Sequence, residues 1–346
     1  MPRREFVHSR RSARRDLKGA KLFSTRLTDL LGIDYPILQG GMRWVARAEL
    51  AAAVANAGGI GFISAHTQPT AAALAQEIAR AHALTQGPIG VNLTILPHLG
   101  SFDYDGYVAA ILEGGVRAVE TAGANPAKYI ERLKAGGVRV IHKCTSVRYA
   151  LKAEQLGADA VSIDGFECAG HPGTDEVPGL ILIPAAVGKV RIPVVACGGI
   201  ADARGLVAAL ALGAEGINMG TRFMLTKESP VPAALKERLV KLTERDAILI
   251  GRSYGDPSRL LRNSVVEEAL AREKEAGVSY KDLLPLIGAP RWMQALERGE
   301  FDGGAIPGGL SIGLMEDVPT CAELIRRFIA EASELINGRL RPLACA

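Results

Sequence analysis

Residues 133–141 read LKAGGVRVI, and this stretch shows the unit from which the fold is built. A helix-like segment runs into Gly136, and a short β-branched, apolar segment follows directly. Glycine adopts the left-handed backbone conformation that often closes a helix, because it has no Cβ. The stretch therefore predicts a helix that ends near Gly136 and a buried strand that begins at residue 138.

The same unit occurs four more times along the chain: ANAGGIGFI (55–63), LEGGVRAVE (112–120), EQLGADAVSI (154–163) and ALALGAEGINM (209–219). With the remaining apolar runs, the pattern predicts eight strands, at residues 36–39, 60–63, 89–93, 118–121, 138–143, 160–164, 193–197 and 216–219. Segments with helical spacing lie between them, at residues 47–57, 69–84, 104–113, 126–135, 147–156 and 203–212. Eight strands that alternate with helices predict an α/β fold, a (β/α)8 TIM barrel.

A doubly wound open sheet is the alternative. Against it, no G-x-G-x-x-G follows the first predicted strand and the chain has no G-x-x-x-x-G-K-[ST]. After residue 222 the strand pattern stops and more highly charged helices follow. The Gly-rich segment 299–317 is either a loop across the barrel mouth or a flexible connector. We predict a basic tail (1–24), a barrel (25–222) and a mainly helical C-terminal region over the barrel mouth (223–346).

Positive charge is concentrated at the start of the chain. The 346 residues include 41 Lys and Arg against 37 Asp and Glu, a net charge of +4. Residues 1–21 contain eight of the basic side chains and two acids, so they carry +6 and the rest of the chain −2. Because a nucleic-acid binder needs its positive charge on a folded face, we expect no nucleic-acid partner. The head is interpreted as a tail, with a basic arm or a transit segment as alternatives.

Cysteine usage and hydropathy bear on the location of the protein. Five cysteines form no C-x-x-C pair, as is typical of a reducing compartment. No apolar run approaches the roughly 18 residues of a membrane helix. Cys144, Cys168, Cys197 and His171 are expected near one end of the barrel, but their spacing does not match that of zinc ligands. We expect a cytoplasmic protein that binds neither a metal nor a membrane.

Glycines end the last two predicted strands. Active sites of such barrels lie at the carboxyl ends of the strands, and phosphate is commonly bound after strands seven and eight. Gly198 and Gly199 follow strand seven, and Gly220 follows strand eight with the hydroxyl of Thr221 beside it. Uncovered backbone N–H groups at helix starts bind anions. These two loops predict a phosphate site, although glycines are also ordinary in tight turns.

Polar and small residues end the first, third and fifth strands. Gly40 and Gly41 would let a planar ligand lie against the backbone, and Met42 suits an aromatic ring. Thr94 lies at the rim. Side chains alternate along a strand, so only one of His142 and Lys143 can face the barrel axis. Lys143 is the more useful there, because a cation stabilises negative charge on an electron-accepting ring.

The loop after strand six is long and contains His171 between Gly170 and Pro172. Long barrel loops usually have a function. Imidazole is suited to acid and base chemistry at neutral pH. His171 is therefore the candidate catalytic residue, with a structural or surface histidine as the alternative.

Six motifs in barrel order resemble the nitronate monooxygenase family, also called 2-nitropropane dioxygenases. They are QGGM (39–42), VNLT (91–94), HKC (142–144), DGFECAGHPG (164–173), CGGIAD (197–202) and NMGTRF (218–223). The similarity runs from about residue 25 to beyond residue 340. Within the family the chain looks closest to bacterial NADH:quinone reductases, and it is more distantly similar to flavin-dependent enoyl-acyl-carrier-protein reductases.

The resemblance implies non-covalent FMN, with its phosphate at the glycine ends of strands seven and eight and its ring near strands one, three and five. His171 matches the active-site histidine of the family. The residues that the resemblance places at the cofactor are Gly41, Met42, Arg43, Thr94, Lys143, Asp164, Ala169, Cys197, Gly198, Gly199, Met219, Gly220 and Thr221. Two of them depart from the family pattern: Arg43 stands where Gln or Ala is frequent, and Cys197 where Ser or Ala is usual.

Three functions remain open. The first is the oxidation of alkyl nitronates by O₂ on FMN. The second is an NAD(P)H:quinone reductase on the same flavin, with NAD(P)H as co-substrate. The third is an enoyl-thioester reductase or a non-catalytic flavin-binding protein. All of them imply a small-molecule partner, and the apolar faces of the C-terminal helices are compatible with a homodimer.

Overall fold

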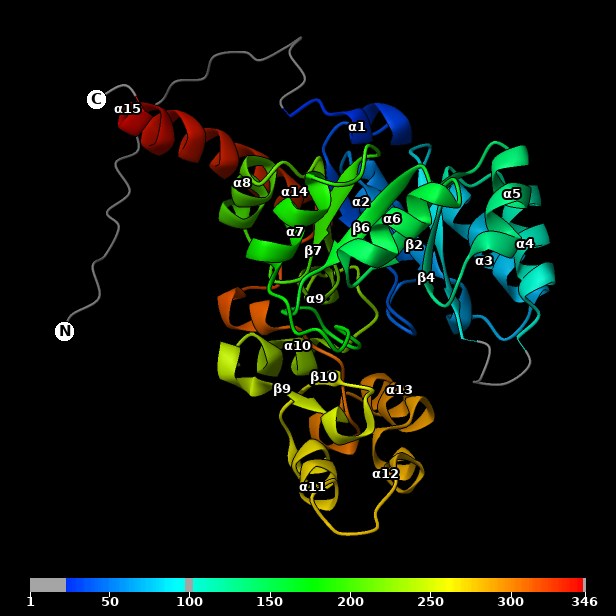
Figure 1. Cartoon of the computed structure of the whole chain (residues 1–346), viewed down its shortest axis with the longest axis vertical. Coiled ribbons are helices and arrows are strands. Elements are labelled where there is room, and N and C mark those ends of the chain that lie inside the picture. The colour runs from blue at the N-terminus through cyan, green and yellow to red at the C-terminus, as the bar shows by residue number, and fades with distance from the viewer. Residues whose placement is uncertain (1–22, 97–101, 345–346) are drawn as a thin grey trace.

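Eight parallel strands form a closed barrel in the computed structural model, which describes residues 23–96 and 102–344 (Figure 1). Each strand pairs with the next, and β8 closes the barrel by pairing with β1. The strands are β1 (Ile37–Gln39), β2 (Ile60–Ser64), β3 (Ile89–Ile95), β4 (Ala118–Gly123), β5 (Arg139–Cys144), β6 (Ala160–Asp164), β7 (Val194–Cys197) and β8 (Gly216–Met219). The predicted barrel is confirmed. The basic segment predicted over residues 1–24 lies outside the described residues, apart from residues 23 and 24.

Helices surround the barrel, and the first helix of the chain closes its amino-terminal end. The helices up to the last strand are α1 (Arg26–Leu31), α2 (Ala48–Asn56), α3 (Ala71–Leu84), α4 (Tyr104–Glu113), α5 (Ala127–Ala135), α6 (Val147–Gln155), α7 (Gly179–Val187) and α8 (Ala203–Ala211). Leu27 and Leu31 of α1 pack against Leu38, Phe62 and Ile141 inside the barrel. The amino-terminal half of the barrel is therefore a packed apolar core, which leaves the carboxyl end for a site.

The eighth helix of the ring comes from the far end of the sequence. Helix α14 (Cys321–Glu334) packs against both α8 and α2, so it occupies the place of the helix that would follow β8. Residues between α9 (Thr221–Met224) and α14 form an insertion at this point. The ring thus includes a helix that the sequence interpretation assigned to the C-terminal region, while the domain boundaries themselves stay a prediction.

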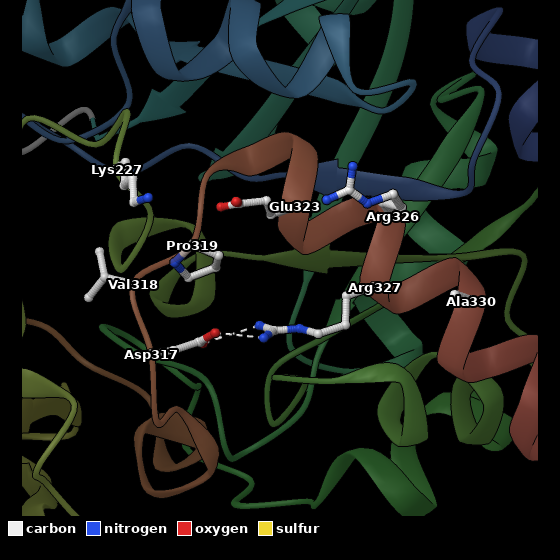
Figure 2. Close-up of a pocket in the computed structure, with 8 residues that line it drawn as sticks. All are labelled: Lys227, Asp317, Val318, Pro319, Glu323, Arg326, Arg327 and Ala330. Atoms are coloured by element: carbon white, nitrogen blue, oxygen red, sulfur yellow. Dashed lines mark hydrogen bonds and ion pairs between the residues drawn. The ribbon is translucent and has the colours of Figure 1, made fainter. Parts of the chain in front are cut away.

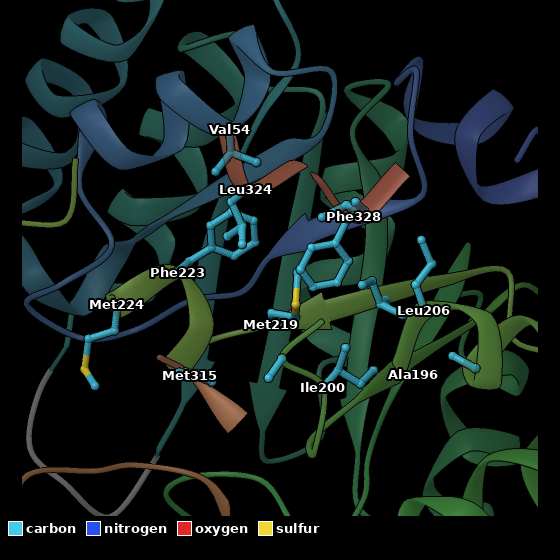
Figure 3. Packing of buried hydrophobic residues seen from close by; sticks show 14 of the residues in the cluster. Val54, Ala196, Ile200, Leu206, Met219, Phe223, Met224, Met315, Leu324 and Phe328 are labelled. Atoms are coloured by element: carbon cyan, nitrogen blue, oxygen red, sulfur yellow. The ribbon is translucent and has the colours of Figure 1, made fainter. Parts of the chain in front are cut away.

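Figure 3 shows how α14 is attached. Phe328 and Leu324 of α14 lie beside Met219 at the end of β8 and Phe223 of α9. All four side chains are buried in one hydrophobic cluster. Burial of an aromatic or aliphatic side chain contributes about 2 kcal/mol each. This cluster joins the end of the chain to the barrel wall.

The C-terminal region lies over the barrel mouth, as predicted, and contains α10 (Ala233–Leu239), β9 (Ala247–Ile250), β10 (Ser258–Leu261), α11 (Ser264–Arg272), α12 (Tyr280–Ile287) and α13 (Ala289–Arg298). A short helix, α15 (Arg341–Ala344), follows α14. The strand pattern does not stop after residue 222 as expected, because β9 and β10 form an antiparallel pair. Two four-residue strands are too short to produce a clear alternation.

Helix α7 was absent from the helices named from the sequence. Its residues, GLILIPAAV, are almost all apolar and include Pro184 within the helix. Apolar spacing cannot indicate a helix when every position is apolar, and an internal proline argues against one. Among the described residues, no helix is both long and apolar enough to span a bilayer.

Candidate active site

Three side chains meet inside the barrel near the carboxyl ends of β5, β6 and β7. The Lys143 Nζ lies 3.4 Å from Oδ1 of Asp164 and 3.6 Å from Sγ of Cys197. Ile141 belongs to the interior core, so Lys143, two residues further along β5, faces the same way. His142 faces away from the axis, and its Nδ1 lies 2.9 Å from Oγ1 of Thr121. The prediction that Lys143 points inward is therefore confirmed.

Lys143 is charged at neutral pH. Burial is the largest single effect and works to lower its pKa, but Asp164, Cys197, Glu120 and Cys168 together outweigh burial, and the pKa lies well above its usual value. Burial raises the pKa of the Cys197 thiol, and the Asp164 carboxylate adds to this, so Cys197 stays protonated. The interior of the mouth thus contains a fixed cation and a neutral thiol.

A buried carboxylate connects the strand ends below this group. Glu120 of β4 is fully buried. Its Oε2 accepts hydrogen bonds from the backbone N–H of Gly41 at 3.0 Å and from the Asn92 amide at 2.8 Å, and its Oε1 accepts from the Asn218 amide. Asn218 also donates to Ser162 Oγ. These contacts join β1, β3, β4, β6 and β8 just beneath the mouth.

Free backbone donors line the ends of β7 and β8. The N–H groups of Gly198, Gly199 and Gly220 donate to no acceptor among the described residues. Gly198 and Gly199 have φ of 87° and 76°, values that side chains other than glycine rarely adopt. Strands β7 and β8 are paired, so the two loops are neighbours. This arrangement fits a phosphate group, as the sequence predicted.

The glycines after β1 have a packing role as well. A Cβ on Gly40 would lie 2.4 Å from Oδ1 of Asn218, and a Cβ on Gly41 would lie 2.1 Å from the Asn92 side chain. Only glycine fits at these positions whether or not a ligand is bound. The pair is therefore no independent sign of a planar ligand.

The C-terminal region contributes a third glycine segment to the mouth. The Gly309 N–H donates to Oγ1 of Thr221 at 3.1 Å, and the Leu310 N–H donates to the Glu167 carbonyl at 3.0 Å. The Gly-rich segment 299–317 therefore crosses the mouth and is not a free connector. Because Thr221 Oγ1 accepts the hydrogen bond from Gly309, the hydroxyl proton of Thr221 stays available to a ligand.

Of the remaining predicted cofactor residues, three lie at the mouth and one has a side chain that points away from it. Thr94 donates to Oδ1 of Asn92, and Met42 lies close to Gly220, so both belong to the mouth. The Ala169 backbone N–H faces Gly309. The Met219 side chain points outward into the hydrophobic cluster, so only its backbone reaches the site.

Arg43 lies in a half-buried aromatic pocket beside the β1 end. Burial lowers its pKa, with Tyr107 opposing, and burial together with Arg43 lowers the pKa of His66 to about 4. No ion pair joins Arg43 to a carboxylate among the described residues. Trp44, which follows it, has a left-handed backbone with φ of 68°. Such conformations cluster at functional sites.

His171 does not point into the barrel interior. Its side chain is 63% exposed, and its Nε2 lies 3.6 Å from Oδ1 of Asp256, between β9 and β10. The backbone beside it is well anchored, because Gly170 and Arg259 exchange two hydrogen bonds. The structure thus places the imidazole on the loop above β6, facing the C-terminal region.

Sequence reasoning missed Glu120, Asp256 and Arg259. Glu120 lies on the same face of β4 as the interior residue Ala118, so an acid at an interior position was a signal that could have been used. Asp256 and Arg259 lie in a charged segment with no pattern that distinguishes them from surface residues. Their contacts depend on tertiary structure alone.

A cavity of about 520 Å³ lies elsewhere, on the outer side of the barrel (Figure 2). Asp317 and Arg327 pair across it at 2.6 Å. Its lining residues are Lys227, Asp317, Val318, Pro319, Glu323, Arg326, Arg327 and Ala330. None of the predicted site residues is among them. Within the described chain, no three His, Cys, Asp or Glu side chains come together as metal ligands would.

A model of the nitronate monooxygenase family matches residues 24–100 and 97–331, which is most of the chain. The chain belongs to the nitronate monooxygenase family. It is therefore an enzyme, a flavin-dependent oxidoreductase of this family.

Relatives of the chain have several activities. A (3aS,4S,5R,7aS)-5-hydroxy-7a-methyl-1-oxo-octahydro-1H-indene-4-carboxyl-CoA dehydrogenase of Rhodococcus jostii is 33% identical, over 92% of this chain and 98% of the relative. The structure of FabK from Thermotoga maritima is 36% identical with a TM-score of 0.84, over 92% of this chain and 99% of FabK. A nitroalkane oxidase from Streptomyces ansochromogenes is 30% identical with a TM-score of 0.78, over 90% and 99%. Family membership therefore leaves the substrate open.

Proposed function

We propose that the chain is an FMN-dependent nitronate monooxygenase, which oxidises alkyl nitronates with O₂. The observation that carries this proposal is the partly buried, charged Lys143 beside Cys197, the residue directly before the glycines that end β7. A cation in a site of low dielectric strengthens the binding of negative charge. The match to the family supports the choice of a nitronate, which is itself an anion.

The residues present fit FMN. Gly198, Gly199 and Gly220 would donate their free N–H groups to the phosphate, and the Thr221 hydroxyl would add a fourth donor. The ring would lie near Gly41, Met42, Thr94 and Lys143, with Asp164, Ala169 and Cys197 lining the site. When bound, FMN supplies the two-electron acceptor of the reaction.

Each side chain of the mouth has a separate task. Lys143 stabilises negative charge on the bound ring or substrate, and Asp164 holds the ammonium group in place at 3.4 Å. His171, on the loop above, holds the substrate or takes its proton, because an imidazole exchanges protons near neutral pH. The C-terminal region covers part of this space, where Gly309 and Leu310 bond to Thr221 and Glu167.

Cofactor content and oxygen uptake test the proposal. The purified protein should be yellow, release FMN on denaturation and consume O₂ with an alkyl nitronate. Lys143→Met should lower kcat/KM at least about 100-fold, the order of loss expected when a buried electrostatic partner is removed. Lys236→Met is the matched control: Lys236 is also buried, but it donates to the Ser229 carbonyl, away from the mouth. A colourless protein that cannot take up FMN would contradict the proposal.

A CoA thioester is the second candidate substrate. It is favoured by the full-length relationship to the Rhodococcus jostii carboxyl-CoA dehydrogenase. The half-buried Arg43 beside the mouth suits a substrate with anionic groups. Turnover of acyl- or enoyl-CoA with no O₂ uptake on a nitronate would select this function over the first.

Quinone reduction by NAD(P)H on the same FMN is the remaining alternative. Rapid NADH or NADPH oxidation with a quinone, and no O₂ uptake with a nitronate, would establish it. We also propose a cytoplasmic homodimer, which size-exclusion chromatography with light scattering and cell fractionation would check.

A further inference from the structure

The loop after β6, residues 165–178, is clasped by the β9–β10 hairpin of the C-terminal region. Gly170 donates its N–H to the Arg259 carbonyl at 3.1 Å, and Arg259 donates its N–H to the Gly170 carbonyl at 2.6 Å. In Figure 1 the yellow hairpin lies next to the green loops at this end of the barrel. Two backbone hydrogen bonds therefore fix the residue directly before His171.

The Arg259 side chain strengthens this clasp. It is almost fully buried. Its Nε donates to the Cys168 carbonyl at 3.1 Å, and its Nη2 donates to the Phe166 carbonyl at 2.6 Å. The guanidinium carbon also lies 4.7 Å from the centre of the Phe166 ring. The hairpin thus holds the loop at Phe166, Cys168 and Gly170, which directly precede His171.

Beyond the clasp, the hairpin presents a carboxylate to the imidazole. Oδ1 of Asp256 lies 3.6 Å from Nε2 of His171, and both side chains are about half exposed or more. At 3.6 Å the two atoms are further apart than a hydrogen bond allows, and catalytic contacts of this kind often shorten in complexes. The Asp256 backbone N–H donates to the Gly251 carbonyl, so the carboxylate is held by the turn of the hairpin.

Other charged groups surround this pair. Tyr280 of α12 lies next to Asp256; burial, with the carboxylate adding to it, raises the tyrosine pKa to about 12, so its hydroxyl stays protonated. Glu176 of the loop pairs with Arg252 at 2.8 Å, which leaves both of these charges compensated. Among the described residues, Asp256 is the carboxylate that faces His171.

We propose that Asp256 is a positioning residue that acts through His171, orienting its imidazole from the C-terminal region. The proposal rests on the function proposed for His171 in this family of reactions. A carboxylate beside one ring nitrogen sets the tautomer and the direction of the other nitrogen. Loop and hairpin therefore form one unit, although the histidine and the aspartate come from different parts of the chain.

The direct test is the ring tautomer of His171 in the intact protein. In Asp256→Asn, the ratio of the two neutral tautomers, read from the ring ¹⁵N shifts, should change by about twofold or more, because the carboxylate no longer favours the proton on Nε2. Comparison with His171→Gln assigns the signal. Glu176→Gln is the matched control, because it removes a carboxylate from the same loop–hairpin contact without touching His171. An unchanged ratio in Asp256→Asn, or an equal change in Glu176→Gln, would overturn the proposal.

Kinetics of the FMN-loaded enzyme provide the second readout. In Asp256→Asn, kcat should fall several-fold with FMN content unchanged. Asp256→Glu should restore most of the rate. If His171→Gln leaves turnover intact while Asp256→Asn still changes the tautomer ratio, the function proposed for His171 fails and the pairing stands. An unchanged kcat in Asp256→Asn, while His171→Gln abolishes turnover, contradicts the positioning role.

Discussion

The Glu120 carboxylate accepts the backbone N–H of Gly41 at 3.0 Å inside the barrel. This bond fixes the end of β1, which forms one wall of the mouth, to the centre of β4. Because the amides of Asn92 and Asn218 donate to the same carboxylate, every acceptor of Glu120 faces a donor. A fully buried carboxylate needs such partners in order to remain charged.

Glu120→Gln should therefore destabilise the barrel and weaken flavin binding. The glutamine NH₂ would face donors, and we expect the free energy of unfolding to fall by about 2 kcal/mol. Urea denaturation and FMN release by ultrafiltration would measure the two effects. In the control Glu154→Gln, the exposed carboxylate that accepts from the Arg191 and Ile192 N–H groups is lost, and FMN should stay bound. Equal FMN loss in both variants would show that Glu120 has no special relation to the site.

The phosphate cradle is tested by two glycines with the same backbone conformation. Gly199 has φ of 76° and Gly137 has φ of 77°. Alanine should cost about 1 kcal/mol of stability at either position, because a Cβ is disfavoured there. Only Gly199→Ala should also weaken FMN binding, by about tenfold or more, because its Cβ would lie 3.3 Å from the Glu167 side chain and displace the loop that presents the free N–H groups. Fluorescence titration with FMN would decide: matched affinities in the two variants would place the phosphate elsewhere.

Stability should fall in mild acid because of His142. Burial lowers its pKa to about 4, against 6.5 in the unfolded chain, with the Thr121 hydrogen bond opposing. Below pH 6.5 the unfolded chain binds a proton that folded His142 excludes, so stability is lost as the pH falls towards 4. Between pH 7 and pH 5 this amounts to about 2 kcal/mol.

His142→Asn should flatten that decrease, because asparagine does not titrate. Urea unfolding at pH 7 and pH 5 would measure it in both proteins. A smaller decrease in stability should remain in the variant, because burial and Arg43 also lower the pKa of His66 to about 4. A variant that loses as much stability as the parent between the two pH values would exclude His142 as the cause.

Asp317 joins the insertion to the barrel through two arginines. It pairs at 3.3 Å with Arg222, whose side chain is 2% exposed. It also pairs with Arg327 of α14 at 2.6 Å (Figure 2). Asp317→Asn would leave Arg222 buried without a carboxylate, at a cost of about 2 kcal/mol. Glu267→Gln, which breaks an exposed pair with Arg262, should cost less than about 1 kcal/mol. Thermal unfolding would compare them, and a cost no larger than that of the control would show that Arg222 does not depend on Asp317.

Local patterns were sufficient for the barrel and for part of the site. Gly58, Gly157 and Gly213 have the left-handed conformation expected at helix ends, and the strands that follow them were located within a few residues. The same expectation was wrong for Gly114 and Gly136, because the next glycine, Gly115 or Gly137, adopts that conformation instead. The Lys143 side chain was oriented correctly because alternation along a strand is a local property. By contrast, α7 was missed, since an apolar helix with an internal proline has no helical spacing.

The sequence by itself determined the eight-strand barrel, the strand ends that form the mouth, and the family of the enzyme, because each depends on residues close together in the chain. Only the tertiary structure decided that α14 completes the ring of helices and that the hairpin clasps the loop of His171. The Arg259 side chain and the Cys168 carbonyl are 91 residues apart, and α14 reaches its place across the insertion. Packing and hydrogen bonding between such distant segments depend on where the barrel brings them together, which no periodicity along the chain records.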